Sequence, residues 1–300
     1  MKRIVVLSGK GGTGKTTVAG ALIHLSGALR FAECDVDAPN LHLAVENPPD
    51  GTEEAYFGLP RARIDQEACD RCGECAALCR FGAVSRGADG RYDIDPLACE
   101  GCALCEMACE SRAIAMRPMA AGRLIARSGG GRFFSDARLN PGGGNSGRLV
   151  SEVKRRMNAA GAAGDLAVID GSPGIGCPVI ASVGGADLVL IVTEPTLSGI
   201  SDMERVLRTA AQLGARCAVC VNKADGNPEI SDGIEAFCAR AALPFLGRIP
   251  FDREVVEAVN AGESVVLRGG AAAEALRALY GNLTALLRTG QDDGIKEESV

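Results

Sequence analysis

Along most of this chain, apolar and polar positions follow two patterns, one typical of buried strands and one typical of helices. Short apolar runs predict buried strands at residues 3–8, 31–34, 166–170, 188–193, 215–221 and 245–249. Helical spacing of apolar residues predicts helices at 15–29, after Pro178, and at 199–213, 228–241, 253–261 and 271–287. Strands that alternate with helices predict an α/β fold, in which a mostly parallel sheet carries helices on both faces.

The alternation stops between residues 65 and 118, where the chain is rich in cysteine, dense in turns and poor in apolar runs. Because the α/β pattern resumes afterwards, we expect a small inserted α+β domain at 65–118 within a discontinuous domain made of 1–64 and 119–290. Residues 123–149 combine short β-like pieces with many glycines, and we expect a hairpin or loop region there. Residues 291–300 form a polar tail that we expect to fray.

Composition restricts the setting of the protein. The chain has 300 residues and a net charge of −6, without a basic block suited to nucleic acid or to an anionic membrane surface. It has no apolar run long enough to cross a membrane, and its first residues lack a signal-peptide cleavage pattern. We therefore expect a cytoplasmic protein that binds neither nucleic acid nor a membrane directly. Its 13 cysteines then favour metal ligation over disulfides, because the cytosol keeps thiols reduced.

A phosphate-binding loop is predicted near the N-terminus. Residues 9–16 spell G-x4-G-K-T between a predicted strand and a predicted helix, so backbone N–H groups and the helix N-terminus can face phosphate oxygens. In this motif Lys15 reaches the β- and γ-phosphates and Thr16 binds Mg²⁺. The predicted nucleotide contacts of the loop are Gly9, Lys10, Gly11, Gly12, Thr13, Gly14, Lys15, Thr16 and Thr17.

A second lysine in the loop, Lys10, is typical of the deviant Walker A motif of the MinD/ParA/Mrp/nitrogenase-iron-protein group. Segment 34–41 resembles the acidic segment of that group, 170–174 its second switch, and 222–225 and 249–252 its adenine-side segments. The resemblance covers nearly all of the chain outside 65–118. With the insert included, the chain is similar to MinD-superfamily ATPases that carry a ferredoxin domain, such as the ATPases of the orange-protein complex of anaerobic bacteria.

This resemblance implies an ATP-dependent dimer, formed with itself or with a paralogous ATPase, that holds two ATP molecules between its protomers. Lys10 would cross the interface to the partner's nucleotide, and Asp35 would orient or deprotonate the attacking water. The other roles implied are Mg²⁺ binding through water for Asp170, γ-phosphate sensing for the Gly174 amide, and adenine-side contacts for Asn222 and Pro250. Alternatives remain for two of these residues, because Asp35 also suits a turn cap and Asn222 a strand-end cap.

Two cysteine runs with identical C-x2-C-x2-C-x3-C spacing lie in the insert. Such a run holds a [4Fe–4S] cluster in bacterial ferredoxins, and in two-cluster ferredoxins the fourth cysteine ligates the other cluster. The usual proline after the fourth cysteine is absent, since Arg80 and Glu110 stand there. Zinc remains the alternative metal, because four cysteines also bind zinc. The predicted ligands are Cys69, Cys72, Cys75 and Cys109 for the first cluster, and Cys99, Cys102, Cys105 and Cys79 for the second.

Five cysteines stand outside these runs: Cys34, Cys177, Cys217, Cys220 and Cys238. We expect them to be buried apolar residues, since free cysteine is commonly buried. Cys217 and Cys220 are three residues apart in a predicted strand, so they should point to opposite faces and share no metal. For Cys177 the resemblance leaves a second possibility, a cluster shared across a dimer interface.

Three functions are compatible with these patterns. The first is an ATPase whose nucleotide switches gate electron transfer from two permanent clusters to a redox partner protein. The second is an ATP-dependent carrier or assembly factor for iron–sulfur or other metal clusters, with a metal-cluster partner protein. The third is a positioning ATPase like MinD or ParA in which the clusters sense redox state.

Overall fold

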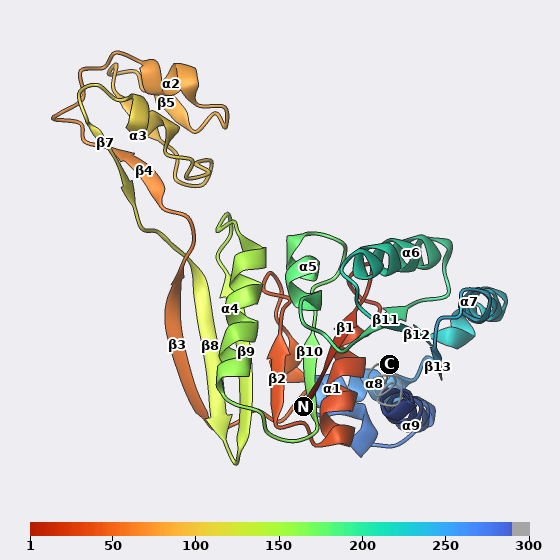
Figure 1. Ribbon diagram of the computed structural model, residues 1–300. Coiled ribbons are helices and arrows are strands. Elements are labelled where there is room, and N and C mark those ends of the chain that lie inside the picture. The colour runs from red at the N-terminus through yellow and green to blue at the C-terminus, as the bar shows by residue number, and fades with distance from the viewer. Residues whose placement is uncertain (290–300) are drawn as a thin grey trace, which may run out of the picture.

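The computed structural model describes residues 1–289 and contains a nine-stranded central sheet (Figure 1). The strand order is β13-β12-β11-β1-β10-β2-β9-β8-β3. Neighbours from β13 to β9 are parallel, whereas β9 with β8 and β8 with β3 are antiparallel. The strands are β1 (Lys2–Leu7), β2 (Arg30–Glu33), β3 (Asp50–Phe57), β8 (Ala120–Gly129), β9 (Arg132–Leu139), β10 (Leu166–Asp170), β11 (Leu188–Thr193), β12 (Cys217–Asn222) and β13 (Phe245–Ile249).

Helices cover both faces of this sheet, and the α/β prediction is thereby confirmed. Alternate residues of β1 point to opposite faces, so Ile4 and Val6 join one buried cluster and Val5 and Leu7 the other. The first cluster receives α1 (Lys15–Ser26), α8 (Arg253–Ala261) and α9 (Ala271–Thr289). The second receives α4 (Ser146–Ala159), α5 (Cys177–Val183), α6 (Leu197–Gln212) and α7 (Pro228–Arg240). Short 3-10 helices η1 (Leu41–Leu43), η2 (Ala224–Gly226) and η3 (Val265–Leu267) complete the connections.

The region 123–149 contains the expected hairpin, formed by β8 and β9, but the loop expectation is wrong at its C-terminal end. Residues from Ser146 onward form α4, which buries Leu149, Val150, Val153 and Met157 against the sheet. Glycines at 142–144 precede this helix and hide its start in the sequence. Strand β3 was also not expected, because it lies at the sheet edge and is mostly exposed.

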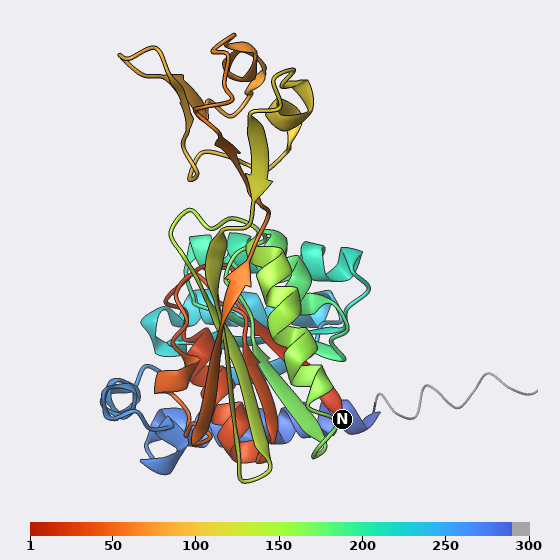
Figure 2. The ribbon, with the colours of Figure 1, turned by 90° about the vertical axis from the view of Figure 1, so that its left-hand side faces the viewer.

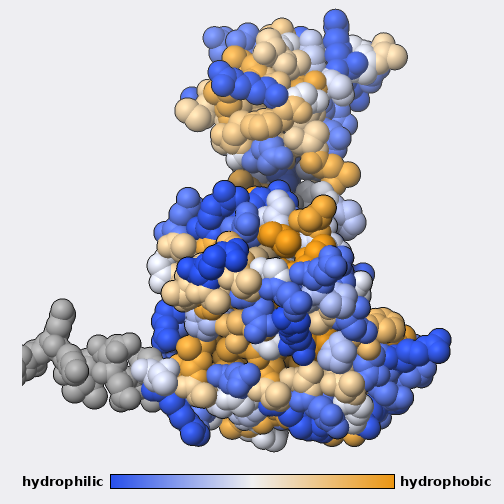
Figure 3. All heavy atoms as spheres, turned by 90° about the vertical axis from the view of Figure 1, so that its right-hand side faces the viewer, coloured by the Kyte–Doolittle hydropathy of each residue, from blue (hydrophilic) through white to orange (hydrophobic). Residues whose placement is uncertain are grey.

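The cysteine-rich segment forms a separate lobe beyond the edge hairpin β3–β8 (Figures 1 and 2). A two-stranded ladder of β4 (Arg61–Ile64) and β7 (Ile114–Arg117) lies at its base, so the paired region begins before residue 65. The lobe also contains α2 (Glu74–Leu78), α3 (Leu104–Ala108) and the paired strands β5 (Val84–Arg86) and β6 (Tyr92–Ile94). Figure 3 shows the narrow waist between the lobe and the larger body. The predicted tail at 291–300 and residue 290 lie outside the described residues.

Candidate functional site: a nucleotide cleft and two cysteine cavities

The phosphate-binding loop connects β1 to α1 at the carboxyl edge of the sheet. Gly12 and Gly14 have φ angles of 81° and 88°, in the left-handed region that favours glycine. A Cβ atom at Gly14 would also lie 2.1 Å from Nδ2 of Asn222. The glycines therefore permit both the turn and its close contact with the end of β12.

Lys15, Thr16 and Asp170 converge at the start of α1. The Lys15 ammonium lies 2.6 Å from Oδ1 of Asp170, and the Thr16 hydroxyl donates to Oδ2 at 2.6 Å. Both members of the ion pair are buried, with Asp170 fully inaccessible. The structure thus brings the predicted phosphate lysine together with the two predicted Mg²⁺ residues.

A cleft of about 550 Å³ opens beside this group. Backbone and side chains of the loop form one wall, and Asp35, Asn40, Leu43, Pro173 and Val259 lie around it. Burial raises the pKa of Asp35, while the nearby Lys15 opposes that shift. A carboxylate poised in this way suits the handling of a proton or a water molecule.

The second-switch segment lies against the loop from the other side. The Gly174 amide donates to the carbonyl oxygen of Ser8 at 2.9 Å. Gly174 has a φ of 92°, so its position is another that favours glycine. The amide that is predicted to sense the γ-phosphate is therefore hydrogen-bonded to the residue that precedes Gly9 of the loop.

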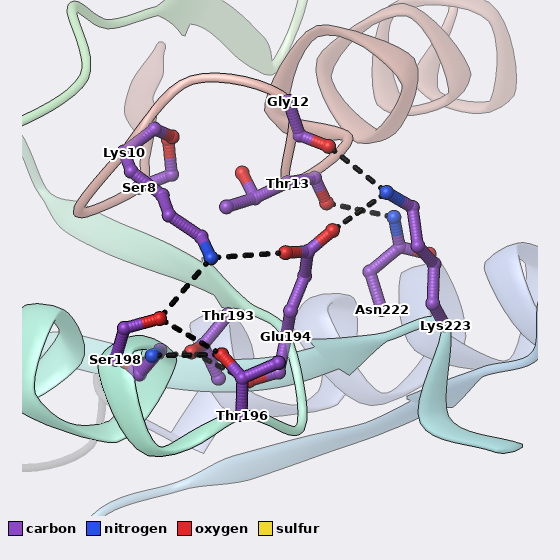
Figure 4. A network of polar contacts seen from close by, with 11 residues as sticks. Ser8, Lys10, Gly12, Thr13, Thr193, Glu194, Thr196, Ser198, Asn222 and Lys223 are labelled. Carbon is purple, nitrogen blue, oxygen red and sulfur yellow. Dashed lines mark hydrogen bonds and ion pairs between the residues drawn. The ribbon is translucent and has the colours of Figure 1, made fainter. Parts of the chain in front are cut away.

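Glu194 organises a network of lysines around the loop (Figure 4). Lys10 lies 3.4 Å from Oε2 of Glu194 and 3.4 Å from the Ser198 hydroxyl, while Lys223 lies 2.6 Å from Oε1 of Glu194. Burial acts against ionisation, but the hydrogen bonds and charges of Lys223 and Lys10 prevail and lower the pKa of Glu194. Sequence reasoning missed Glu194, although its place directly after β11, at the carboxyl edge, was a usable signal.

Two residues of the predicted adenine side donate hydrogen bonds to carbonyl oxygens of the loop. Asn222 donates through Nδ2 to the carbonyl oxygen of Thr13 at 2.7 Å, and Lys223 donates to that of Gly12 at 3.0 Å (Figure 4). Pro250 follows β13, and next to it the Phe251 amide donates to Asp225. Asn222 contacts the loop directly, and its adenine contact remains a prediction.

Glu33 is a further acidic residue near this site that sequence reasoning missed. Its side chain is fully buried at the end of β2, and Oε2 accepts a hydrogen bond from the Leu41 amide at 2.6 Å. Desolvation, together with the negative charge of Asp170, raises the pKa of Glu33 to about 9. Burial therefore favours the protonated form of this carboxyl group.

Each predicted set of four cysteines lines its own cavity in the lobe. Cys79, Cys99, Cys102 and Cys105 line one, which we call the proximal cavity because Gly101 packs on Pro60 at the base of the lobe. Cys69, Cys72, Cys75 and Cys109 line the other, the distal cavity.

These cavities fit a polynuclear group whose thiolate ligands surround it. Each cavity takes its fourth cysteine from the other run, as in two-cluster ferredoxins, and apolar Ala83, Ile94 and Ile114 pack among the cysteines. Within residues 1–289, no three His, Cys, Asp or Glu side chains are grouped around a single ion position. The cluster ligands remain a prediction, which this arrangement matches.

The remaining cysteines mostly lie in the core. Cys34, Cys220 and Cys238 are buried, and Cys217 is half-buried. Cys220 and Cys217 contact opposite buried clusters, as their strand spacing predicts. Cys177, however, is exposed, so the expectation of burial is wrong there. It is the first residue of α5, where the helix leaves the second-switch segment.

The amino-acid sequence is similar to those of several known proteins. The chain is 31% identical to the uncharacterized protein MJ0578 of Methanocaldococcus jannaschii over 224 residues, which cover 74% of this chain and 78% of that protein. It shares 36% identity over 64 residues with the cytosolic Fe-S cluster assembly factor Nubp1 homolog of Drosophila grimshawi, or 21% of each chain.

Among solved structures, the fold is similar to that of the septum site-determining protein MinD of Pyrococcus horikoshii, determined in complex with Mg-ADP. The TM-score is 0.57 at 17% identity, over 95% of this chain and 97% of that one.

No helix within residues 1–289 has the length and apolar character needed to cross a membrane. A family model described as the CobQ/CobB/MinD/ParA nucleotide binding domain matches residues 4–265, so the chain belongs to this family of nucleotide-binding proteins.

Proposed function

We propose that the protein is a Mg²⁺-dependent ATPase whose nucleotide state gates electron transfer from two [4Fe–4S] clusters in the lobe to a partner protein. The observation that carries this proposal is the pair of cavities lined by four cysteines each, in one chain with the phosphate-binding loop. Clusters of this type transfer single electrons and are held by thiolates.

The residues of the nucleotide cleft have suitable parts in phosphoryl transfer. Lys15 would contact the phosphates of bound ATP in place of Asp170, and Asp170 and Thr16 would then hold Mg²⁺. Asp35 orients or deprotonates the attacking water from the other wall of the cleft. Catalysis of this kind depends mainly on positioning and on charge stabilisation, which these groups supply.

A contiguous path of packed elements supports coupling between cleft and lobe. The segment after Asp170 leads into α5, and buried Lys154 of α4 donates to the carbonyl oxygens of Ala181, Ser182 and Gly184 at the end of α5. Helix α4 packs on β9, which pairs with β8, and β8 is the strand that leads back from the lobe. Movement of the second switch therefore has a mechanical route to the lobe.

The active form is proposed to be a dimer of this chain or a heterodimer with a paralogous ATPase. Lys10 then leaves Glu194 and reaches the nucleotide of the partner protomer. Its side chain is 37% exposed, so only the contacts to Glu194 and Ser198 must be released. These contacts hold the Lys10 side chain beside the loop until ATP and the partner protomer are bound.

The likeness to an Fe-S cluster assembly factor favours one second candidate. In that case the clusters are cargo that passes to a metal-cluster partner under the control of ATP. The two candidates differ in the fate of iron: gated electron transfer leaves the iron in the protein, whereas a carrier loses it to an acceptor.

An anaerobic EPR redox titration of the purified protein, with and without MgATP, tests the first proposal. We expect two [4Fe–4S] signals and a shift in at least one potential when MgATP is added. The same titration with Lys15→Ala is the control and should show the signals without the shift. Two clusters with unmoved potentials, or transfer of iron to an apo-acceptor, would favour the second candidate.

A further inference from the structure

A buried guanidinium group lies beneath one of the two cysteine cavities. Arg61, the first residue of β4, is only 5% exposed, and its Nη1 donates to the carbonyl oxygen of Cys99. Cys99 lines the proximal cavity. The Nε atom of Arg61 is buried and has no hydrogen-bond partner among residues 1–289.

The charge of Arg61 has no counterpart in the protein as far as the structure describes it. No carboxylate of residues 1–289 forms a salt bridge with Arg61. The residue directly opposite in the ladder is Arg117, which has the same charge. An unpaired buried cation is strongly unfavourable, so such a group indicates an anion that the polypeptide does not itself supply.

The proximal cavity is where that anion fits. Four thiolates outweigh the positive charge of a [4Fe–4S] core, so the assembled site is a net anion, and one-electron reduction makes it more negative. Two acidic residues, Asp70 and Glu74, line the distal cavity, whereas one, Glu100, lines the proximal cavity. No lysine or arginine lines either cavity, but Arg61 is joined to the proximal one through the carbonyl oxygen of Cys99. The two sites therefore lie in unequal electrostatic fields.

We propose that Arg61 is the counter-charge of the proximal cluster and raises its reduction potential above that of the distal cluster. The inference rests on the proposed function, because it requires both clusters. A fixed positive charge stabilises the reduced, more negative form, and net charge and hydrogen bonding near the sulfurs are recognised controls of potential. An electron delivered to the lobe then rests at the end nearer the ATPase body.

Arg61 also lies close to the larger body of the protein, which contains the nucleotide cleft. Its Nη2 atom is 3.5 Å from the point where a Cβ on Gly144 would lie. Gly144 belongs to the loop that leads into α4, the helix joined to α5 by Lys154. Arg61 thus lies between the loop that leads into α4 and the proximal cavity.

The test is an EPR redox titration, with dithionite as reductant, of the intact wild type and of Arg61→Gln and Arg61→Lys. Signals are assigned by Cys102→Ser, which removes a proximal ligand, and Cys72→Ser, which removes a distal one. We expect Arg61→Gln to lower the proximal potential and leave the distal one in place, whereas Arg61→Lys, which keeps the charge, stays near the wild type. Arg63→Gln, an exposed arginine of the same strand, is the matched control and should change neither.

Each result of this titration either supports or overturns the role of Arg61 as a counter-charge. Two assembled clusters with unchanged potentials in Arg61→Gln overturn the role of Arg61 and leave the proposed function intact. If Arg61→Gln loses the proximal cluster, its recovery in Arg61→Lys supports the counter-charge, and its loss in both variants overturns it. A wild-type protein without iron–sulfur signals overturns the proposed function itself, and the counter-charge with it.

Discussion

Asp170 accepts hydrogen bonds from both Lys15 and Thr16, so one buried carboxylate fixes the two side chains that the motif assigns to phosphate and Mg²⁺. A buried ion pair of this kind contributes modestly to net stability, but breaking it leaves an unpaired charge. The arrangement is therefore better explained by function than by stability. It holds Lys15 and Thr16 together at the start of α1, and under the proposed function phosphate would replace Asp170 as the partner of Lys15.

Lys15→Ala should weaken ATP binding by about 30- to 160-fold, since one charged hydrogen-bonding contact to phosphate contributes about 2–3 kcal/mol. The visible absorbance of the clusters should be retained, because the lobe takes no ligand from the loop. Isothermal titration calorimetry and absorption spectra measure the two quantities. Lys2→Ala, a partly exposed lysine of β1, is the control. Simultaneous loss of nucleotide binding and of cluster absorbance would contradict a two-part molecule.

Glu33 makes stability depend on pH. Its pKa is raised from 4.5 to about 9 by burial, so between these values the folded protein holds a proton that the unfolded chain releases. The free energy of unfolding must therefore fall as pH rises through this window. Glu33→Gln removes the titrating group, and its Tm relative to the wild type should increase steadily with pH when measured without Mg²⁺ or nucleotide.

The matched control for this pH series is Glu46→Gln, at a glutamate whose side chain is 91% exposed. Its Tm should follow that of the wild type at every pH. Parallel curves for Glu33→Gln and the wild type would show that Glu33 is ionised in the folded protein, contrary to its buried position.

At the scale of secondary-structure elements, one side chain of α4 forms three hydrogen bonds with the end of α5. The Lys154 ammonium donates at 2.8, 2.5 and 2.6 Å to three carbonyl oxygens at the end of α5, where the helix dipole also favours a cation. Lys154→Met should lower the free energy of unfolding by about 2–3 kcal/mol, because the carbonyl groups lose a charged donor. Chemical denaturation measures this. Arg155→Met, at the 66% exposed neighbour, should cost less than about 0.5 kcal/mol.

A stronger consequence of Lys154→Met concerns coupling. If the α4–α5 contact transmits the nucleotide state, the variant should still hydrolyse ATP while the shift of cluster potentials on adding MgATP disappears. An undiminished shift would show that the nucleotide state reaches the lobe by another route.

The sequence predicted the central elements because their patterns are local. Continuous apolar runs identified the strands that are buried on both faces. The loop motif singled out Lys15 and Thr16, which the structure brings together with Asp170. Edge strand β3 escaped because an exposed edge has no such run, and the start of α4 was hidden by glycines. Lys154 and Arg61 escaped for another reason: their partners lie far away in sequence, and only the folded chain brings them together.

For the whole molecule, the separation of body and lobe predicts independent assembly. Cys72→Ser should lower iron content by about one cluster, because each cavity has its own four cysteines. ATP binding and the Tm of the body should remain close to the wild type. Cys177→Ser, an exposed cysteine outside the lobe, is the control and should keep all its iron. Unchanged iron in Cys72→Ser would refute the ligand assignment.

The last paired residues of the edge hairpin are Phe57 and Ala120, which face each other across β3 and β8. Two facing residues of an antiparallel pair are close enough for a tight turn to join them. The whole cysteine lobe thus occupies the place of a hairpin turn at the rim of the sheet, where it breaks no pairing between the inner strands. The lobe can therefore be removed or replaced as a single loop, without any change to the strands of the core.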